Sequence, residues 1–238
     1  MLSRRSPDDT QQVVVIDDQS AVMTLAALED ALKGIPQIGR VEVKNFPNPS
    51  SLTSAIRDGV LYNVILVLAD LKLPGKGSSW TQLGTEVLAE LCRREVANNA
   101  ARIILTAEDR PGNIVPFLKA SSVSQGSLSL QPPIVDAVFA RDAFGVHQFD
   151  FNLRNLSNVQ TVLRFARAKA YLARTMPHHP ILKRSILDYN PEAEKTLFVG
   201  ISEEGIAKAI RDFRELAYNA LISHPFSLAP SSRPAVAR

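Results

Sequence analysis

Apolar residues gather in short runs along the first two thirds of the chain, and helix-like stretches separate them. Five runs read as strands: Val13–Ile16, Val41–Val43, Val64–Ala69, Ile103–Thr106 and Val135–Ala140. Most of the runs are continuous and rich in β-branched residues, which is typical of strands buried on both faces of a parallel sheet. The second run alternates apolar and polar residues, so it predicts an edge strand.

Between these runs, apolar residues recur with the period of a helix. The spacing predicts helices over residues 20–33, 50–57, 81–96 and 114–120, with Ser50 or Ser51 as the N-cap of the second. A Gly- and Ser-rich loop, residues 75–79, precedes the third helix. Because parallel neighbours need helical crossovers, this alternation predicts an α/β fold with a doubly wound, five-stranded parallel sheet.

The pattern turns helical after residue 155. Helices are expected over residues 159–175 and 202–222, the second with Ser202 as its N-cap, and residues 196–200 read as a short strand or a buried turn. The expected organisation has four parts: a disordered lead-in, an α/β domain, a helical extension for dimerisation or output, and a flexible tail, over residues 1–11, 12–155, 156–225 and 226–238.

Composition narrows the protein class. The chain has 238 residues, of which 45% are hydrophobic, enough for a sizeable core. Its single cysteine, Cys92, lies on an apolar helical face and is expected to pack there; one cysteine allows no internal disulfide. No apolar run reaches the ~20 residues that span a bilayer, and no secretory signal opens the chain. We therefore expect a cytoplasmic protein without a membrane partner. The two adjacent histidines, His178 and His179, are expected to be loop residues.

Charge is distributed unevenly. Residues 1–150 carry 14 Lys/Arg and 17 Asp/Glu, whereas residues 151–238 carry 13 and 7. The basic second part fits either a solvated helical face or an acidic partner, including nucleic acid. Aromatic residues do not alternate with the basic ones as a base-stacking surface requires.

Residues with carboxylate or hydroxyl side chains stand at the ends of three of the expected strands. Asp17 and Asp18 follow the first, Asp70 follows the third and Thr106 ends the fourth. If the first strand is central, the three carboxylates converge, and their repulsion calls for bound protons or a cation. Oxygen ligands without Cys or His favour Mg²⁺. One carboxylate could then take up a phosphoryl group, and Thr106 could bind a phosphoryl oxygen.

These residues resemble a response-regulator receiver domain of two-component signalling. The resemblance rests on Asp17-Asp18, on the segment from Asp70 to Pro74-Gly75 and on Thr106, and it covers about residues 11–150. It implies that Asp17, Asp18, Asp70 and the Lys72 carbonyl bind Mg²⁺. Asp70 would be the phosphoacceptor, Thr106 the switch hydroxyl, and a histidine kinase or phosphotransfer protein the partner.

The chain departs from the family pattern at the end of the fifth strand. Arg141 stands where the family has lysine, and its planar guanidinium is not equivalent to an ammonium. The position of the family's switch aromatic holds Val138, with Phe139 one residue away. The Ser121–Pro133 loop makes the interval after Thr106 long.

Several functions fit these observations. The preferred hypothesis is a non-enzymatic response regulator, phosphorylated on Asp70, that signals through protein contacts and a homodimer of its C-terminal helices. Alternatives are a degenerate receiver that acts as an interaction module, a DNA-binding regulator and a Mg²⁺-dependent hydrolase. Residues 200–210 faintly resemble the start of a helix-turn-helix, but the next segment continues without a turn and carries acids, so nucleic acid is not favoured.

Overall fold

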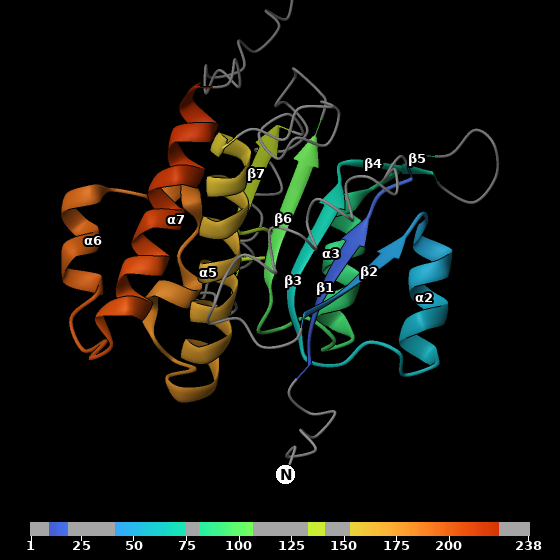
Figure 1. Cartoon of the computed structure of the whole chain (residues 1–238), viewed down its shortest axis with the longest axis horizontal. Helices are drawn as coiled ribbons and strands as arrows, with labels where there is room; N and C mark the ends of the chain where they lie inside the picture. The colour runs from blue at the N-terminus through green and yellow to red at the C-terminus, as the bar shows by residue number, and fades with distance from the viewer. Residues whose placement is uncertain (1–9, 19–40, 75–80, 107–132, 141–152, 224–238) are drawn as a thin grey trace, which may run out of the picture.

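A twisted parallel sheet forms the centre of the molecule (Figure 1). The computed structural model describes residues 10–18, 41–74, 81–106, 133–140 and 153–223. Within these ranges five parallel strands lie in the order β2-β1-β3-β6-β7: β1 (Gln11–Ile16), β2 (Val41–Phe46), β3 (Val64–Asp70), β6 (Ala101–Thr106) and β7 (Ala137–Ala140). This is the 2-1-3-4-5 order of flavodoxin-like doubly wound folds, which confirms the predicted fold class.

Burial follows the hydrophobic pattern of the strands. Every residue of β3 and β6 is buried, as is β1 after Gln11. The β2 strand lies at the edge of the sheet and is only half-buried until Phe46, as its alternating sequence predicted. It also runs three residues beyond Val43. The continuous apolar runs therefore mark the strands that are covered on both faces.

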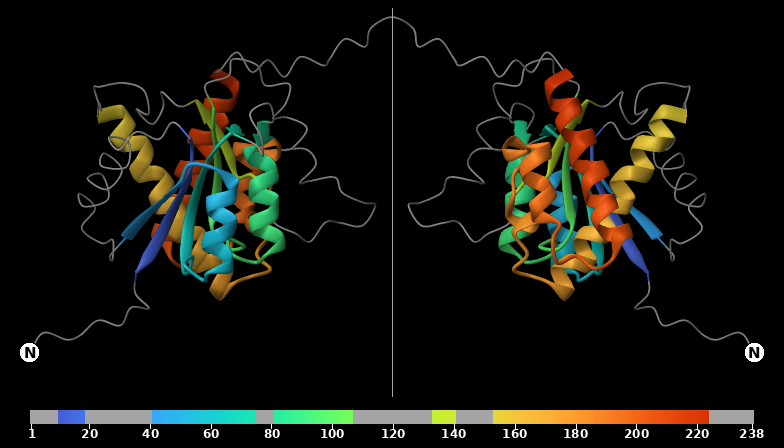
Figure 2. Two further views of the ribbon diagram at one scale, coloured as in Figure 1. Left: turned by 90° about the vertical axis from the view of Figure 1, so that its right-hand side faces the viewer. Right: turned by 90° about the vertical axis from the view of Figure 1, so that its left-hand side faces the viewer.

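Helices cover both faces of the sheet. The helices α2 (Pro49–Arg57) and α3 (Gly84–Arg93) lie on one face and α5 (Leu153–Thr175) on the other (Figure 2). The last helix, α7 (Glu204–Ser223), contacts α5 and β7 beside the β7 edge. In the chain, the short helices η4 (Pro180–Lys183), η5 (Ile186–Asp188) and α6 (Pro191–Leu197) come between α5 and α7. No helix in the described ranges is long and apolar enough to cross a membrane.

The N-cap of α2 differs from the prediction. Asn48 holds that position, and its side-chain oxygen accepts a hydrogen bond from the Ser51 amide at 2.9 Å. Pro49 occupies the first helical turn, where the missing N–H of proline has no cost. The predicted cap at Ser50 or Ser51 was therefore wrong, because the N-cap lies two to three residues earlier in the chain.

The start of α3 was also predicted too early. Thr81–Leu83 form a short strand, β5, that pairs antiparallel with β4 (Lys72–Pro74). The helix begins only at Gly84 and ends at Arg93 rather than at residue 96. A hairpin thus separates β3 from its helix. Each of its strands has only three residues, which is too few for a sequence period to reveal them.

The C-terminal part is helical, as predicted, with different boundaries. The α5 helix starts at Leu153 rather than Val159. Residues 196–200 form no strand; α6 ends at Leu197 and the chain turns with Phe198 buried. The cap of α7 is Glu203, not Ser202, because the Glu203 carbonyl accepts from the Ile206 and Ala207 amides. The predicted helices 20–33 and 114–120, the 75–79 loop, residues 1–9 of the lead-in and the tail 226–238 lie outside the described residues. The lead-in was predicted to reach residue 11, but Gln11 is the first residue of β1.

Aromatic packing joins the C-terminal helices to the sheet. The rings of Phe165 on α5 and Phe213 on α7 stack with their centroids 3.7 Å apart. Phe139 of β7 meets the Phe213 ring edge-on at 6.3 Å. Because all three rings are at most 6% exposed, the helices and the sheet share one core. The predicted domain boundary at residue 155 stays a prediction.

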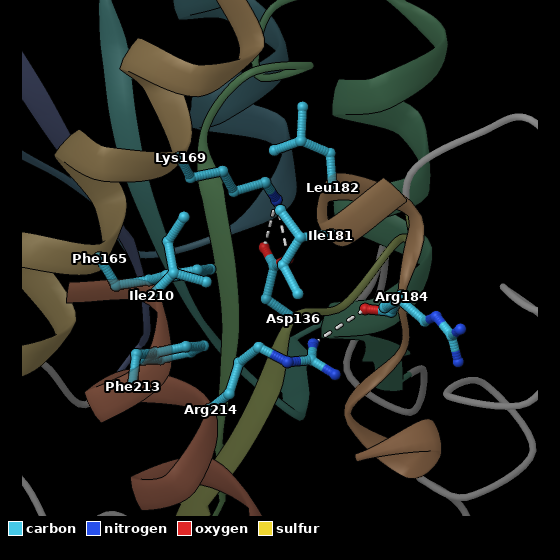
Figure 3. A pocket seen from close by; sticks show the side chains of 9 residues that line it. All are labelled: Asp136, Phe165, Lys169, Ile181, Leu182, Arg184, Ile210, Phe213 and Arg214. Atoms are coloured by element: carbon cyan, nitrogen blue, oxygen red, sulfur yellow. Dashed lines mark hydrogen bonds and ion pairs between the residues drawn. The ribbon is translucent and has the colours of Figure 1, made fainter. Parts of the chain in front are cut away.

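A buried polar cluster reinforces the same junction (Figure 3). The Lys169 ammonium donates to both carboxylate oxygens of Asp136, at 2.6 and 2.7 Å, and the Arg102 amide donates to the same carboxylate at 2.7 Å. A cavity of about 20 Å³ lies beside this pair, between α5, η4 and α7. Burial of Lys169 lowers its pKa to about 8, although the Asp136 charge opposes the shift. The pair ties α5 to the chain just before β7.

Two residues singled out by the sequence have structural roles here. His179 is buried, and its Nδ1 accepts a hydrogen bond from the Ile181 amide at the start of η4, whereas His178 is exposed. The Cys92 sulfur accepts a hydrogen bond from the Arg102 guanidinium at 2.6 Å. The positions of the two histidines agree with the predicted loop, whereas Cys92 is half-buried and contacts a cation instead of packing only among apolar side chains.

Candidate functional site

Three carboxylates meet at the carboxyl end of the central strands. Oxygen atoms of Asp17, Asp18 and Asp70 all lie within 4.8 Å of one another. Asp17 and Asp70 are 3% and 7% exposed, whereas Asp18 is exposed. The structure therefore brings together the three acidic residues that the sequence singled out.

Strand register explains this convergence. Ile16 on β1 is paired with Ala69 on β3, so the next residues, Asp17 and Asp70, are neighbours across the two strands. The Asp17 amide also donates to the Phe46 carbonyl at the end of β2, which extends the pairing by one residue. The carboxyl ends of parallel strands meet at one edge, where open α/β sheets bind their ligands.

The charge of this acidic cluster fits a small divalent cation. Carboxylate oxygens this close repel one another strongly where burial lowers the dielectric constant. The cluster contains oxygen ligands only, which suits Mg²⁺ better than a softer metal. Exposure of Asp18 leaves one side open to solvent, as Mg²⁺ requires because it retains several water ligands.

Thr106 lies on the next strand of the same edge. It is the last residue of β6 and is 2% exposed. Asp70 pairs with Leu105, so Thr106 follows directly after the partner of the aspartate. The structure thus places an acid pair, an acid and a hydroxyl on adjacent strands, in the predicted order.

Lys72 begins the hairpin that follows Asp70. It is the first residue of β4 and pairs with Leu83. Its position two residues after Asp70 is compatible with the predicted role of its carbonyl, which stays a prediction. Arg141 directly follows β7 and lies outside the described residues, so its predicted role also stays untested.

The aromatic residue near the end of β7 belongs to the core. Phe139 is 1% exposed and packs against Phe213 of α7. Val138, at the position of the family's switch aromatic, is also buried. The β7 strand therefore contacts α7 through Phe139, a residue to which the resemblance assigned no role.

Sequence reasoning missed one residue of this region. Gly84, the first residue of α3, donates its amide to the Leu71 carbonyl at 2.8 Å, next to Asp70. The visible signal was a glycine within the first turn of the predicted helix 81–96, but its significance depends on how closely two segments approach in space.

Comparisons with known proteins give structural matches only. No protein-family model matches the chain, and no curated protein matches its sequence. The isolated REC domain of RcsB from Salmonella enterica serovar Typhimurium, solved with phosphomimetic BeF3−, is 14% identical; the match covers 66% of this chain and 87% of that one, with a TM-score of 0.41. The phosphorylated cyanobacterial phytochrome response regulator RcpA is 16% identical over 66% of this chain and 93% of that one, with a TM-score of 0.44.

A longer match extends over both parts of the chain. RcsB of Salmonella typhimurium, described for its conformational dynamism in DNA interaction, is 13% identical over 90% of this chain and 98% of that one, with a TM-score of 0.38. At these sequence identities and TM-scores, the comparisons carry no argument about the site, which rests on the strand order and the acidic cluster of this chain. The similarity is one of fold, to solved response-regulator structures, and in this chain a helical C-terminal part follows the five-stranded sheet.

Proposed function

We propose that this protein is a response regulator that accepts a phosphoryl group on Asp70 in a Mg²⁺-dependent reaction. The observation that carries the proposal is the convergence of Asp17, Asp18 and Asp70 within 4.8 Å at the strand ends. The buried Thr106 on the next strand adds a hydroxyl in the matching order. The activity proposed is that of a regulator and not of an enzyme with a separate substrate.

Each acidic residue has a distinct part in this proposal. Asp17 and Asp18 hold Mg²⁺ together with Asp70 and the Lys72 carbonyl. The bound cation neutralises the cluster and the charge of the incoming phosphoryl group. Asp70 is the nucleophile because it ends the central strand, between the acid pair on β1 and the hydroxyl on β6.

The transfer itself is a displacement at phosphorus. A carboxylate oxygen of Asp70 forms the new P–O bond while the bond from phosphorus to the donor's nitrogen or oxygen breaks and the leaving group keeps the electron pair. A phosphohistidine donor that carries a proton on its other ring nitrogen leaves as neutral histidine, with the electron pair of the broken P–N bond on the released nitrogen. The Thr106 hydroxyl donates a hydrogen bond to a phosphoryl oxygen, and Arg141 supplies a positive charge in place of the family's lysine.

We propose that the C-terminal helix α7 reads the state of this site. Thr106 is paired with Ala140 at the end of β7, and the preceding residue, Phe139, contacts Phe213 of α7. A movement at the end of β6 therefore has a short packed route to the helices. Protein contacts of these helices, including a homodimer, would then carry the signal in the cytoplasm.

Intact-mass spectrometry tests phosphoryl acceptance. The full chain is incubated with Mg²⁺ and a small acyl phosphate donor, beside Asp70→Asn and beside Asp188→Asn, an exposed aspartate in η5. We expect one phosphoryl adduct on the wild type and on Asp188→Asn, and none on Asp70→Asn or with EDTA. Equal labelling of Asp70→Asn would contradict the proposal.

The same experiment separates the alternatives. A folded wild type without an adduct would favour the degenerate interaction module, and Arg141→Lys would then be the first variant to examine. DNA binding is a separate outcome, measured by retardation of duplex DNA at several salt concentrations. The buried pairing of Arg214 with Glu194 removes one α7 cation from any nucleic-acid surface.

A further inference from the structure

We infer that Gly84 is a positioning residue for the acidic cluster, because only a residue without a side chain lets α3 begin against the Asp70 peptide. The inference rests on the proposed function, since it assigns Gly84 a part in setting the Mg²⁺ site. Gly84 is buried and is the first residue of α3, fourteen positions after Asp70 in the chain.

The close approach involves backbone rather than a side chain that could move aside. A Cβ atom on Gly84 would lie far inside van der Waals contact with the Asp70 carbonyl oxygen and 3.0 Å from the Asp70 carbonyl carbon. It would also lie 3.3 Å from Cδ1 of Ile104. Because β3 is held between β1 and β6, the Asp70 peptide cannot retreat without disturbing both neighbours.

Hydrogen bonds hold the segment after Asp70 from two sides. The Leu71 amide donates to the Leu105 carbonyl on β6 at 3.0 Å, and the Leu71 carbonyl accepts from the Gly84 amide at 2.8 Å. Lys72 then pairs with Leu83 in the hairpin. Residues 70–72 are thus fixed between β6 and the first residue of α3. A side chain at position 84 would shift them relative to Asp17 on β1.

Other described glycines do not share this constraint. Gly59 and Gly200 have φ angles of +67° and +98°, so their backbone conformation requires glycine, but a Cβ on either would meet nothing within 4 Å. Gly205, in the first turn of α7, has neither a positive φ nor a close neighbour. It provides a matched control for a glycine-to-alanine substitution.

Mg²⁺ binding by the full chain tests the inference through isothermal titration calorimetry. We expect Gly84→Ala to weaken Mg²⁺ affinity at least tenfold and Gly205→Ala to change it less than twofold. Leu91→Ala, in the last turn of α3, serves as a control for lost stability: it removes a side chain that is 1% exposed, so it should lower the melting temperature but keep the affinity within twofold.

A measurement on the wild type covers the case in which Gly84→Ala does not fold. In a ¹⁵N-labelled full chain, Mg²⁺ should shift the Gly84 amide resonance, leave the Gly205 amide unchanged, and shift neither in Asp70→Asn. Gly84→Ala with wild-type affinity, or a Gly84 amide that ignores Mg²⁺ binding, would overturn the inference alone. A folded wild type that binds no Mg²⁺ would overturn the proposed function together with it.

Discussion

At the scale of single residues, the acidic cluster combines two buried carboxylates with one exposed carboxylate. Asp17 and Asp70 are packed at strand ends, whereas Asp18 faces solvent. Without a cation, the negative charge of Asp18 repels the charges of Asp17 and Asp70, whereas with a cation the Asp18 carboxylate becomes one of its ligands. Removing Asp18 should therefore act on stability in opposite directions in the two conditions.

Asp18→Asn should stabilise the protein without metal, by about 1 kcal/mol, because it removes repulsion between near carboxylates. It should also abolish most of the stabilisation that Mg²⁺ gives the wild type, since a ligand that binds only the folded state raises its stability. Melting temperatures with EDTA and with Mg²⁺ measure both effects. Asp58→Asn, at the exposed end of α2, is the control and should leave the Mg²⁺ effect unchanged. Destabilisation of Asp18→Asn in EDTA would contradict the account.

Lys169 gives the folded state a distinct dependence on pH. Burial lowers its pKa from 10.5 to about 8, so between these values the unfolded chain binds more protons than the folded one. Stability attributable to Lys169 therefore rises as pH increases from about 8 to 10.5. The Asp136 carboxylate faces Lys169 and also accepts a hydrogen bond from the Arg102 amide. The other charged or titratable groups nearby are the Arg102 and Arg214 cations and the Cys92 thiol. Arg184 also lines the cavity, but its side chain points away in Figure 3.

The double variant Lys169→Met/Asp136→Asn should lose this increase. Removing both partners avoids an unpaired buried carboxylate, which by itself costs about 3–5 kcal/mol. Urea unfolding at pH 7, 8, 9 and 10 measures the difference between the variant and the wild type. Parallel pH profiles for the two proteins would contradict the assignment to Lys169.

Sequence predicted the residues of the site whose positions follow from local pattern. Asp17, Asp18, Asp70 and Thr106 each stand at the end of an apolar run, so their convergence follows from a parallel sheet with β1 in a central place. The importance of Gly84 could not be predicted in this way. Its constraint comes from the approach of α3 to the Asp70 peptide, which no spacing along the chain reveals.

At the scale of elements, the helices were predicted more reliably than their ends. The α2 helix illustrates this: its apolar face was visible, but Asn48, rather than a serine, accepts the hydrogen bond at its start. The hairpin of β4 and β5 was missed because its strands are three residues each and pair across the chain segment between them. Short paired segments have too few residues to show a period.

Substitutions at the start of α2 distinguish the two caps. Asn48→Ala should lower the free energy of unfolding by about 1 kcal/mol, because the Ser51 amide loses its acceptor. Ser50→Ala, at an exposed position beside it, should change the free energy by less than about 0.5 kcal/mol. Chemical denaturation of the three proteins measures both values, and a larger effect at Ser50 would restore the sequence-based cap.

At the scale of the whole molecule, the C-terminal helices complete the core of the sheet. The α5 helix contacts β3 and β6, and α7 contacts β7 through Phe213. Composition and periodicity indicated helices here but not whether these helices pack on the sheet. The reason is that an apolar helical face has the same sequence pattern whether it packs against the sheet or against a second copy of the chain. The basic balance of the second part gave no help with that question.

A chain ending at residue 155 should therefore fail to fold cooperatively. It would lack nearly all of α5 and all of α7, and it would expose the buried Phe139, which packs against Phe213 of α7, to solvent. Circular dichroism and thermal melting of this fragment, beside the full chain, measure the effect. A cooperative transition in the fragment would instead support a receiver-like domain that is independent of its C-terminal helices.

The most direct test of the central claim is the position of the phosphoryl group. After incubation with Mg²⁺ and an acyl phosphate, borohydride reduction converts an aspartyl phosphate to homoserine, and peptide mass spectrometry then locates the modified residue. We predict homoserine at position 70, with Asp17 and Asp18 unchanged and no modification in EDTA. Modification at another residue, or none in a folded protein that binds Mg²⁺, would contradict the account.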